Sequence, residues 1–377
     1  MDLFMVAQST ISVGAGEHDR EGCPVSVSLD EDLGFESVKL IDAENGDIVP
    51  AQLDGKTLSW ILNDLKAHNR RDYVLSEGST ASSTHVSFDE RENAIDIRIG
   101  HREFTTFCYG VDQYRPYFFP VFGPEGCQVT RGETSEESAD HIHHRSLYVA
   151  YGEVNHVDVW GEGSNSGRIV HQNFTKKSDG PIVGRIHTNN TWVNAGGDTL
   201  MSDIQNFRVY GLPETGQIID LDLTLIADLG DVFFGDTKEG GIITVRVNPQ
   251  MNASASGTIE NSFGGINEGE TWGKRAAWCD YSGFVDGTHV GVAVLDHINN
   301  PRYPTYWHVR NYGLMGTNIF GSGTFESDKS KDGSYTLTQG EQMDFRFRVY
   351  IHSGNAMDSN VKSKYHDFIN PPSVTVS

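Results

Sequence analysis

The chain has 377 residues, of which 52 are acidic and 29 basic, so its formal net charge is −23 at pH 7. This charge argues against nucleic acid and anionic membrane surfaces as partners, because both are bound through Lys/Arg patches. No apolar run approaches the roughly 20 residues that cross a bilayer, so no membrane insertion is expected. The first residues lack the basic and apolar regions of a signal peptide. The compartment stays open between the cytoplasm and, if a leader has been removed, the periplasm or exterior.

Residues 1–80 predict a small β-rich N-terminal module. Apolar and polar residues alternate at 10–13 and 25–29 in the manner of strands. Residues 38–41 and 48–53 predict a hairpin that turns at Asn45-Gly46. A polar segment of small residues, 75–83, is the candidate linker to the rest of the chain.

Residues 84–377 predict one large domain with many short strands. Alternating segments recur at 94–99, 218–225, 241–247 and 343–350, and the chain has 41 glycines for tight turns. Only residues 360–368 are typical of a helix. Strands without alternating helices favour sheet-on-sheet packing. We therefore predict an all-β protein with a large antiparallel β-sandwich and a short C-terminal helix.

Residues 114–124 combine aromatic side chains with three prolines. Because proline cannot donate to a ladder of hydrogen bonds, this segment is expected to be an ordered loop or an edge. Its aromatic rings fit either a satellite core or a platform for a sugar ring.

Residues 140–146 (DHIHHRS) place three of the 15 histidines beside an acid and an arginine. An apolar run at 147–150 follows, which indicates a strand. In a regular strand His141, His143 and Arg145 would share one side and His144 the other, so at most two histidines would converge. Imidazoles act as metal ligands and as acid/base groups, and the alternative is a solvated loop before a core strand.

Three further segments combine charged and aromatic residues near glycines. Residues 235–241 carry Lys238 and Glu239 in a tight loop, and residues 272–283 mix Trp272 with Arg275 and Asp280. In residues 296–313 a buried strand ends at Asp296 and His297, where a rigid scaffold displays functional groups. In the next predicted strand one face carries Tyr306, His308 and Arg310, and the other carries Trp307 and Val309.

The chain has no nucleophile elbow, phosphate-binding loop, dinucleotide fingerprint or HExxH zinc motif. What remains is a polar and aromatic set on four separated segments. Such a set suits a pocket built from strand ends and loops, and its acids and bases suit glycan chemistry.

At these segments the sequence resembles a bacterial family labelled methane oxygenase, PmoA-like, over roughly residues 100 to 352. The resemblance implies a large sandwich like that of sugar mutarotases and some polysaccharide lyases. It also implies, by association with glycan-degrading bacteria, a role in polysaccharide degradation. The residues that carry it are Arg115-Pro116-Tyr117, Gly123-Pro124, Val129-Thr130-Arg131, His143 to Leu147, Asn155, Val157-Asp158, Trp160, the loop 235–241, Trp272 to Ala276, Asp280 to Gly283, and Asp296-His297 through Tyr312-Gly313.

The leading hypothesis is a carbohydrate-active enzyme, a hydrolase or lyase, that cleaves or rearranges a glycoside by His/carboxylate chemistry. The alternatives are a non-catalytic glycan-binding module and a metal-dependent oxygenase on a cupin-like sandwich. A divalent metal is a candidate cofactor, with His141, His143 and His144 as ligands. The predicted catalytic residues are His144, Lys238, Glu239, His297 and His308. The predicted substrate-binding residues are Arg145, Trp160, Trp272, Arg275, Asp280, Tyr306, Trp307 and Arg310.

Overall fold

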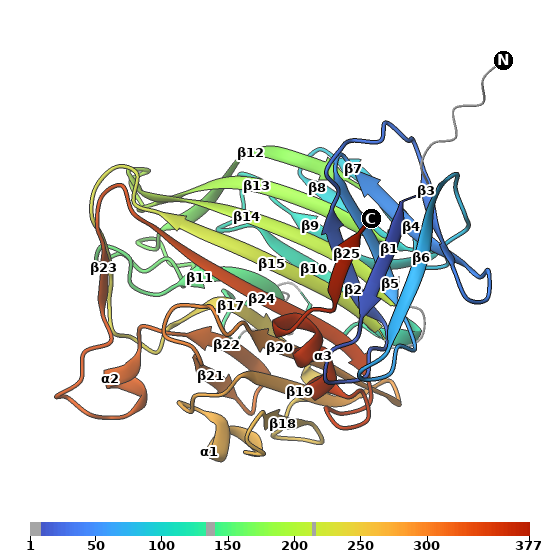
Figure 1. Ribbon diagram of the computed structural model, residues 1–377. Coiled ribbons are helices and arrows are strands. Elements are labelled where there is room, and N and C mark those ends of the chain that lie inside the picture. The colour runs from blue at the N-terminus through green and yellow to red at the C-terminus, as the bar shows by residue number, and fades with distance from the viewer. Residues whose placement is uncertain (1–8, 133–139, 213–215) are drawn as a thin grey trace.

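The computed structural model describes residues 9–132, 140–212 and 216–377 (Figure 1). Strands make up 51% of the chain and helices 7%. Within the described residues every strand pair is antiparallel, from the hairpins of the first strands to the pairing of the last strand. The predicted all-β class is therefore confirmed. No helix in these ranges is both long and apolar enough to cross a membrane.

Two eight-stranded sheets form the large sandwich, and a two-stranded ribbon flanks them. The first sheet runs, from edge to edge, through β21 (Tyr306–Arg310), β22 (Leu314–Asn318), β17 (Gly240–Arg246), β11 (Leu147–Tyr151), β10 (Tyr117–Val121), β9 (Arg102–Cys108), β8 (Ala94–Ile99) and β7 (Val86–Arg91). The second runs through β12 (Arg168–Ser178), β13 (Val183–Val193), β14 (Thr199–Leu212), β15 (Gly216–Ile226), β24 (Gln342–Ser353), β20 (Thr288–Asp296), β19 (Trp278–Val285) and β18 (Thr258–Asn261). The ribbon pairs β16 (Val232–Phe234) with β23 (Tyr335–Leu337).

A seven-stranded sheet is built from the start of the chain and its last strand. Its order is β2 (Cys23–Ser28), β5 (Thr57–Leu62), β4 (Ile48–Asp54), β3 (Val38–Asp42), β6 (Arg70–Glu77), β1 (Thr10–Gly14) and β25 (Ser373–Val376). The predicted hairpin is present as β3 and β4, which pair Leu40 with Val49. This sheet has a hydrophobic core of its own. The division into residues 1–80 and 84–377 stays a prediction, and β25 returns to the N-terminal sheet.

The helices are short, and the predicted C-terminal helix is α3 (Val361–Ile369). It lies against the outer face of the second sheet, where Val361 and Tyr365 pack with Tyr350 of β24 and with Ile61 of β5. Two smaller helices, α1 (Asn267–Thr271) and α2 (Ser322–Phe325), lie beyond β21 and β22 in Figure 1. Two 3-10 turns, Pro124–Gly126 and Pro249–Met251, also lie within the described residues.

The main core fills the space between the two large sheets. Strand alternation explains this: Leu221, Leu223 and Leu225 of β15 point into the core, while Asp220 and Asp222 point outward. The N-terminal sheet and α3 pack on the outer face of the second sheet. The outer face of the first sheet carries only a small cluster around Tyr148 and Trp160, so loops can build a site there.

The expectation that residues 114–124 form a loop or edge is wrong for β10, which lies between β9 and β11 inside the sheet. Only Tyr117 and Phe118 pair with β11, and the register with β9 shifts between Phe118 and Val121. Pro120 falls in this irregular part, where the ladder does not require its missing N–H.

Candidate active site

The histidine segment is a turn that leads into β11 and is not part of a regular strand. His141 has a φ of 50° and Ser146 a φ of 67°, and β11 begins at Leu147. The rings of His141 and His144 stack 4.8 Å apart with 8° between their planes. His143 meets His144 edge-on at 4.5 Å. The limit of two converging histidines applied to a regular strand, and here the left-handed residues break that alternation, so the three rings lie together.

Two buried arginines hold the backbone of this turn. Arg115 is 1% exposed and Arg131 is 3% exposed. Arg115 donates to the carbonyl oxygen of His143 at 3.0 Å. Arg131 donates to three carbonyl oxygens at 2.7, 2.7 and 3.1 Å, those of Asp140, His141 and His144. The planar guanidinium group of each arginine thus fixes the backbone of the turn.

Asp140 and Arg246 join the two stacked imidazoles in one hydrogen-bonded network. Asp140 Oδ1 contacts Nδ1 of His141, and its Oδ2 accepts from Arg246 at 3.1 Å. Arg246 Nη1 lies 2.8 Å from Nδ1 of His144. A guanidinium group only donates, so His144 Nδ1 accepts and the proton of the neutral ring is on Nε2. A carboxylate only accepts, so His141 Nδ1 donates and its Nε2 keeps a lone pair. The two rings therefore have opposite tautomers.

All three imidazoles are neutral near pH 7. Burial, followed by the charges of Arg246 and Arg131, lowers the pKa of His141. Burial lowers the pKa of His143 to about 4 and that of His144 well below its ordinary value. The cause is that a charged imidazolium would lose hydration beside cationic arginines.

Aromatic rings enclose the network on two sides. Tyr312 stacks on His141 at 5.1 Å, and the guanidinium carbon of Arg246 lies 4.7 Å from the Tyr312 ring centre. Trp160 lies 5.6 Å from His144, with only 3% of its surface exposed. The prediction that Trp160 stacks on a sugar is wrong, because this buried ring supports the histidines instead.

The glycine-bounded loop adds a second set of charges to the same face. Gly240 has a φ of 155°, which only glycine adopts readily, and a Cβ there would lie 2.7 Å from the Tyr151 ring. Lys238 and Glu239 form an ion pair with side chains 40% and 46% exposed. Both charges act on the pKa of His141, which places this pair beside the histidine turn.

His308 lies on β21 beneath this loop, with 2% of its surface exposed. Burial, together with the charges of Arg310 and Lys238, lowers the pKa of His308 to about 3. The backbone of Gly240 and Lys238 lies beside the ring and opposes this lowering of the pKa. The structure therefore places a neutral His308 at the floor of the site, shielded from solvent.

Arg310 connects the histidine turn to α1. It donates to Glu268 at 2.6 Å, and its guanidinium carbon lies 5.2 Å from the Trp272 ring centre. Its charge also acts on the pKa of Tyr312. Arg310, Trp272 and Tyr312 are all partly exposed, so a ligand on this face would meet them.

Three predicted substrate-binding residues, Arg145, Arg275 and Tyr306, bind neighbouring loops beside the site. Arg275 donates to three backbone carbonyl oxygens of residues 302–304 and lies 5.5 Å from the Tyr306 ring centre. Tyr306 stacks on Phe325 at 5.6 Å and its hydroxyl group donates to Glu326. Arg145 donates to both oxygens of Glu162, at 2.9 and 2.5 Å.

The structure excludes three predicted residues from this face. Trp307 is fully buried in the main core because strand alternation turns it away from His308. Asp280 belongs to the second sheet and bonds His352 at 2.7 Å. His297 lies at the end of β20 in that sheet and packs on Phe368 of α3 at 5.0 Å. Their predicted roles at a shared site are therefore wrong.

The three histidines do not fit one metal ion. Stacked rings direct their nitrogen lone pairs past each other, and the Nδ1 atoms of His141 and His144 already have partners. In the described part of the chain no group of three or more His, Cys, Asp or Glu side chains has the arrangement of a metal site.

Sequence reasoning missed the groups that organise the histidines. A charged residue within an otherwise apolar strand is a signal that would have found one of them, because β17 ends with Arg246 after five apolar or small residues and Thr244. Glu268 lies on α1 and the others lie in loops, with no spacing that links them. The residues to which the sequence assigned no role of their own are Arg115, Arg131, Asp140, Arg246, Glu268 and Tyr312.

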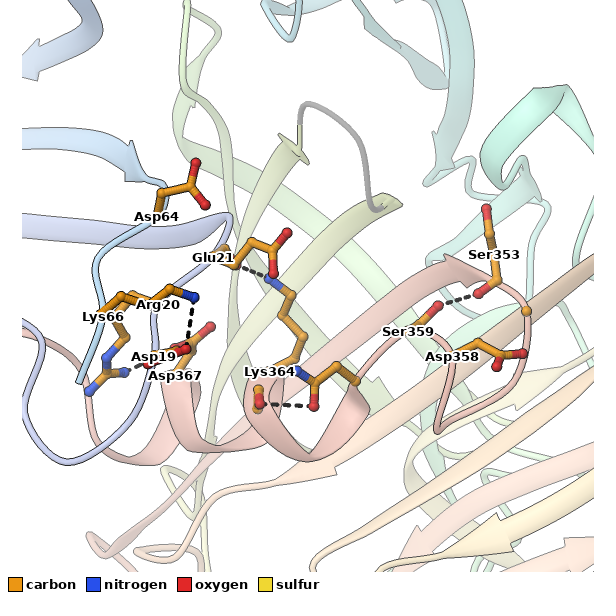
Figure 2. A pocket seen from close by; sticks show the side chains of 13 residues that line it. Asp19, Arg20, Glu21, Asp64, Lys66, Ser353, Asp358, Ser359, Lys364 and Asp367 are labelled. Carbon is orange, nitrogen blue, oxygen red and sulfur yellow. Dashed lines mark hydrogen bonds and ion pairs between the residues drawn. The ribbon is translucent and has the colours of Figure 1, made fainter.

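A separate hollow of about 440 Å³ lies between the N-terminal sheet and α3 (Figure 2). Its charged groups bind one another: Arg20 pairs with Asp367 at 3.0 Å, and Lys364 donates to the carbonyl oxygens of Glu21 and Gly22. These contacts attach α3 to the N-terminal sheet.

Residues 94–366 match the model of a family of unknown function, DUF6807. The chain belongs to the DUF6807 family. The region of the predicted resemblance lies within this match, but the label methane oxygenase, PmoA-like, is not confirmed. No curated protein matches the sequence.

Two solved structures share part of the DUF6807 chain's fold. One is a glycosyl hydrolase family 38 protein from Enterococcus faecalis, with TM-score 0.44, 9% identity, and coverage of 98% of this chain and 47% of the other. The second is an alpha-mannosidase from Enterococcus faecalis V583, with TM-score 0.44, 8% identity, and coverage of 98% and 46%. The chain therefore spans less than half the length of either protein. A likeness this distant carries no information on the residues of the site.

Proposed function

We propose that the outer face of the first sheet is the active site of a carbohydrate-active enzyme that cleaves or rearranges a glycoside by acid–base chemistry. His141 acts as the base, and the neutral His144 donates a hydrogen bond to the oxygen on which negative charge develops. The face combines neutral imidazoles, carboxylates, guanidinium groups and partly exposed aromatic rings.

The opposite tautomers of the two stacked rings carry this proposal. His141 Nε2 can accept a proton from a substrate hydroxyl or carbon, and Asp140 would stabilise the imidazolium that forms. His144 Nε2–H can donate to the oxygen on which negative charge develops. Because the pKa of each ring is lowered, both are neutral at pH 7, as these two roles require.

The saccharide assignment is supported by the strip of side chains that continues from the histidine turn. Tyr312 and Trp272 offer ring surface, while Glu239, Arg310 and Glu268 offer hydrogen-bonding groups. Aromatic surface beside charged hydrogen-bonding groups suits a sugar, which has apolar ring faces and hydroxyl edges. The oxygenase alternative needs two histidines and a carboxylate around iron, and the described residues contain no such set.

The test is turnover of a panel of polysaccharides and synthetic glycosides by the full chain. New reducing ends report cleavage, and ultraviolet absorbance of unsaturated products separates elimination from hydrolysis. His141→Ala and His144→Ala are expected to lower turnover by about 10²- to 10⁴-fold.

His156→Ala is the matched control. This imidazole also contacts a carboxylate, Glu153 at 3.2 Å, but its side chain is 79% exposed and it lies outside the histidine turn. Turnover by this variant should equal that of the wild type. If the wild type binds saccharides without turnover, the protein is a glycan-binding module and not an enzyme. Full activity of both His141→Ala and His144→Ala would refute the proposed roles.

A further inference from the structure

A group of buried hydrogen-bond donors without acceptors lies beneath the histidine turn. Among the described residues, no partner is found for the Tyr148 hydroxyl, for Trp160 Nε1, or for Nε of Arg115, Arg131 and Arg246. Buried polar groups are paired in the great majority of cases, so several such donors in one place require an explanation. Apart from Arg246, these residues lie outside the His141–Asp140–Arg246–His144 network described above.

The Tyr148 hydroxyl is the centre of this group. Tyr148 projects from β11 on the outer face of the first sheet, and the guanidinium carbon of Arg115 lies 5.1 Å from its ring centre. Arg115, Arg131 and Arg246 all act electrostatically on Tyr148, and the carboxylate of Glu162 acts on it in the opposite direction. The phenol and three guanidinium groups therefore converge from four different segments.

The three arginines have few anionic partners in the part of the chain that the structure describes. The hydrogen bonds of Arg131 go to backbone carbonyl oxygens alone. Arg115 has Glu162 at 3.7 Å, but this carboxylate already accepts two hydrogen bonds from Arg145. Arg246 has the half-exposed Asp140. Burial lowers the pKa of each guanidinium group.

We propose that the Tyr148 hydroxyl and the guanidinium groups of Arg115, Arg131 and Arg246 form a site for an anion under the catalytic turn. A water molecule would satisfy one or two donors but would leave the buried positive charge without a counterion. The ligand is a compact anion, a halide or a carboxylate, because the side chains that surround it are almost fully buried.

The site has a consequence for the turn above it. Arg115 and Arg131 hold the backbone of the histidines, and Arg246 holds the ring of His144. An anion that binds all three arginines would fix their positions and so order the base His141 and the hydrogen-bond donor His144. This inference concerns binding and stability, and it stands whether or not a glycoside is the substrate.

The test is thermal unfolding of the full chain at constant ionic strength, with sodium chloride, bromide, acetate or glucuronate as the varied salt. Saturation is expected to raise Tm by about 2 °C or more. Tyr148→Phe should lose at least half of that rise. A response to chloride and bromide assigns a free ion, whereas a response to glucuronate alone assigns a substrate carboxylate.

Tyr151→Phe is the matched control, because Tyr151 lies on the same strand but faces the core and donates to Gly235 at 2.6 Å. It should be less stable than the wild type and keep the full anion response. Crystals of the wild type soaked in bromide should show an anomalous peak at the Tyr148 hydroxyl. An equal anion response in all three proteins, or the absence of any response and of the bromide peak, would overturn the proposal.

Discussion

Replacing Asp140 by asparagine should separate the catalytic role of its carboxylate from its contribution to stability. The amide keeps the shape of the side chain but removes the charge that lies between His141 and Arg246. The asparagine can donate as well as accept, so His141 is no longer held in the tautomer with its proton on Nδ1.

The cost in stability should be small, because the Asp140 side chain is 52% exposed and that of His141 is 41% exposed. A hydrogen bond between charged groups contributes about 1.5–3 kcal/mol, and water replaces much of this at half-exposed sites. We expect the free energy of unfolding to fall by about 1 kcal/mol and Tm by about 1–3 °C. Turnover should fall by about 10²-fold or more, since the base loses its orienting carboxylate.

Nitrogen-15 NMR of the histidine side chains measures the tautomer without any substrate. In the wild type His141 should be protonated on Nδ1, and in Asp140→Asn this signal should shift toward a mixture of tautomers. Glu153→Gln, which changes the exposed carboxylate next to His156, is the control and should leave the His141 signal unchanged. The reasoning fails if wild-type His141 carries its proton on Nε2, or if Asp140→Asn keeps full turnover.

Three further predictions concern stability. Because the pKa of His143 is lowered to about 4, its contribution to the free energy of unfolding is present above pH 6.5 and lost as the pH falls toward 4. Urea unfolding of His143→Gln should therefore show a flatter pH dependence of stability between pH 6.5 and 4 than that of the wild type. Burial raises the pKa of Asp296 to about 7, so its contribution to the free energy of unfolding has the opposite pH dependence and is lost as the pH rises from about 4 through 7. Asp296→Asn should reduce this loss of stability. An unchanged slope of stability against pH in this variant would contradict the shift. Trp307→Ala should lower the free energy of unfolding by about 3–5 kcal/mol. Trp272→Ala should lower it by less, and calorimetry should show that this variant binds saccharide more weakly.

The sequence by itself determined the class of the fold. Alternating apolar residues, glycine-rich turns and the absence of helix periodicity between strands led to an antiparallel all-β protein, and residues 360–368 led to α3. These features are local, because a strand or helix is specified by the side chains along its own length. Strand alternation also assigned Tyr306, His308 and Arg310 to one face of β21, and all three lie on that face.

Only the tertiary structure decided which polar residues meet. Left-handed backbone at His141 and Ser146 makes the segment before β11 a turn and brings three imidazoles together. Strand order then placed Arg246 of β17 beside that turn and sent His297 to the second sheet. Sheet order depends on contacts between residues far apart in the chain, which local patterns do not encode. For the same reason, the burial of Arg115 under the turn follows from packing in three dimensions and not from its sequence neighbours.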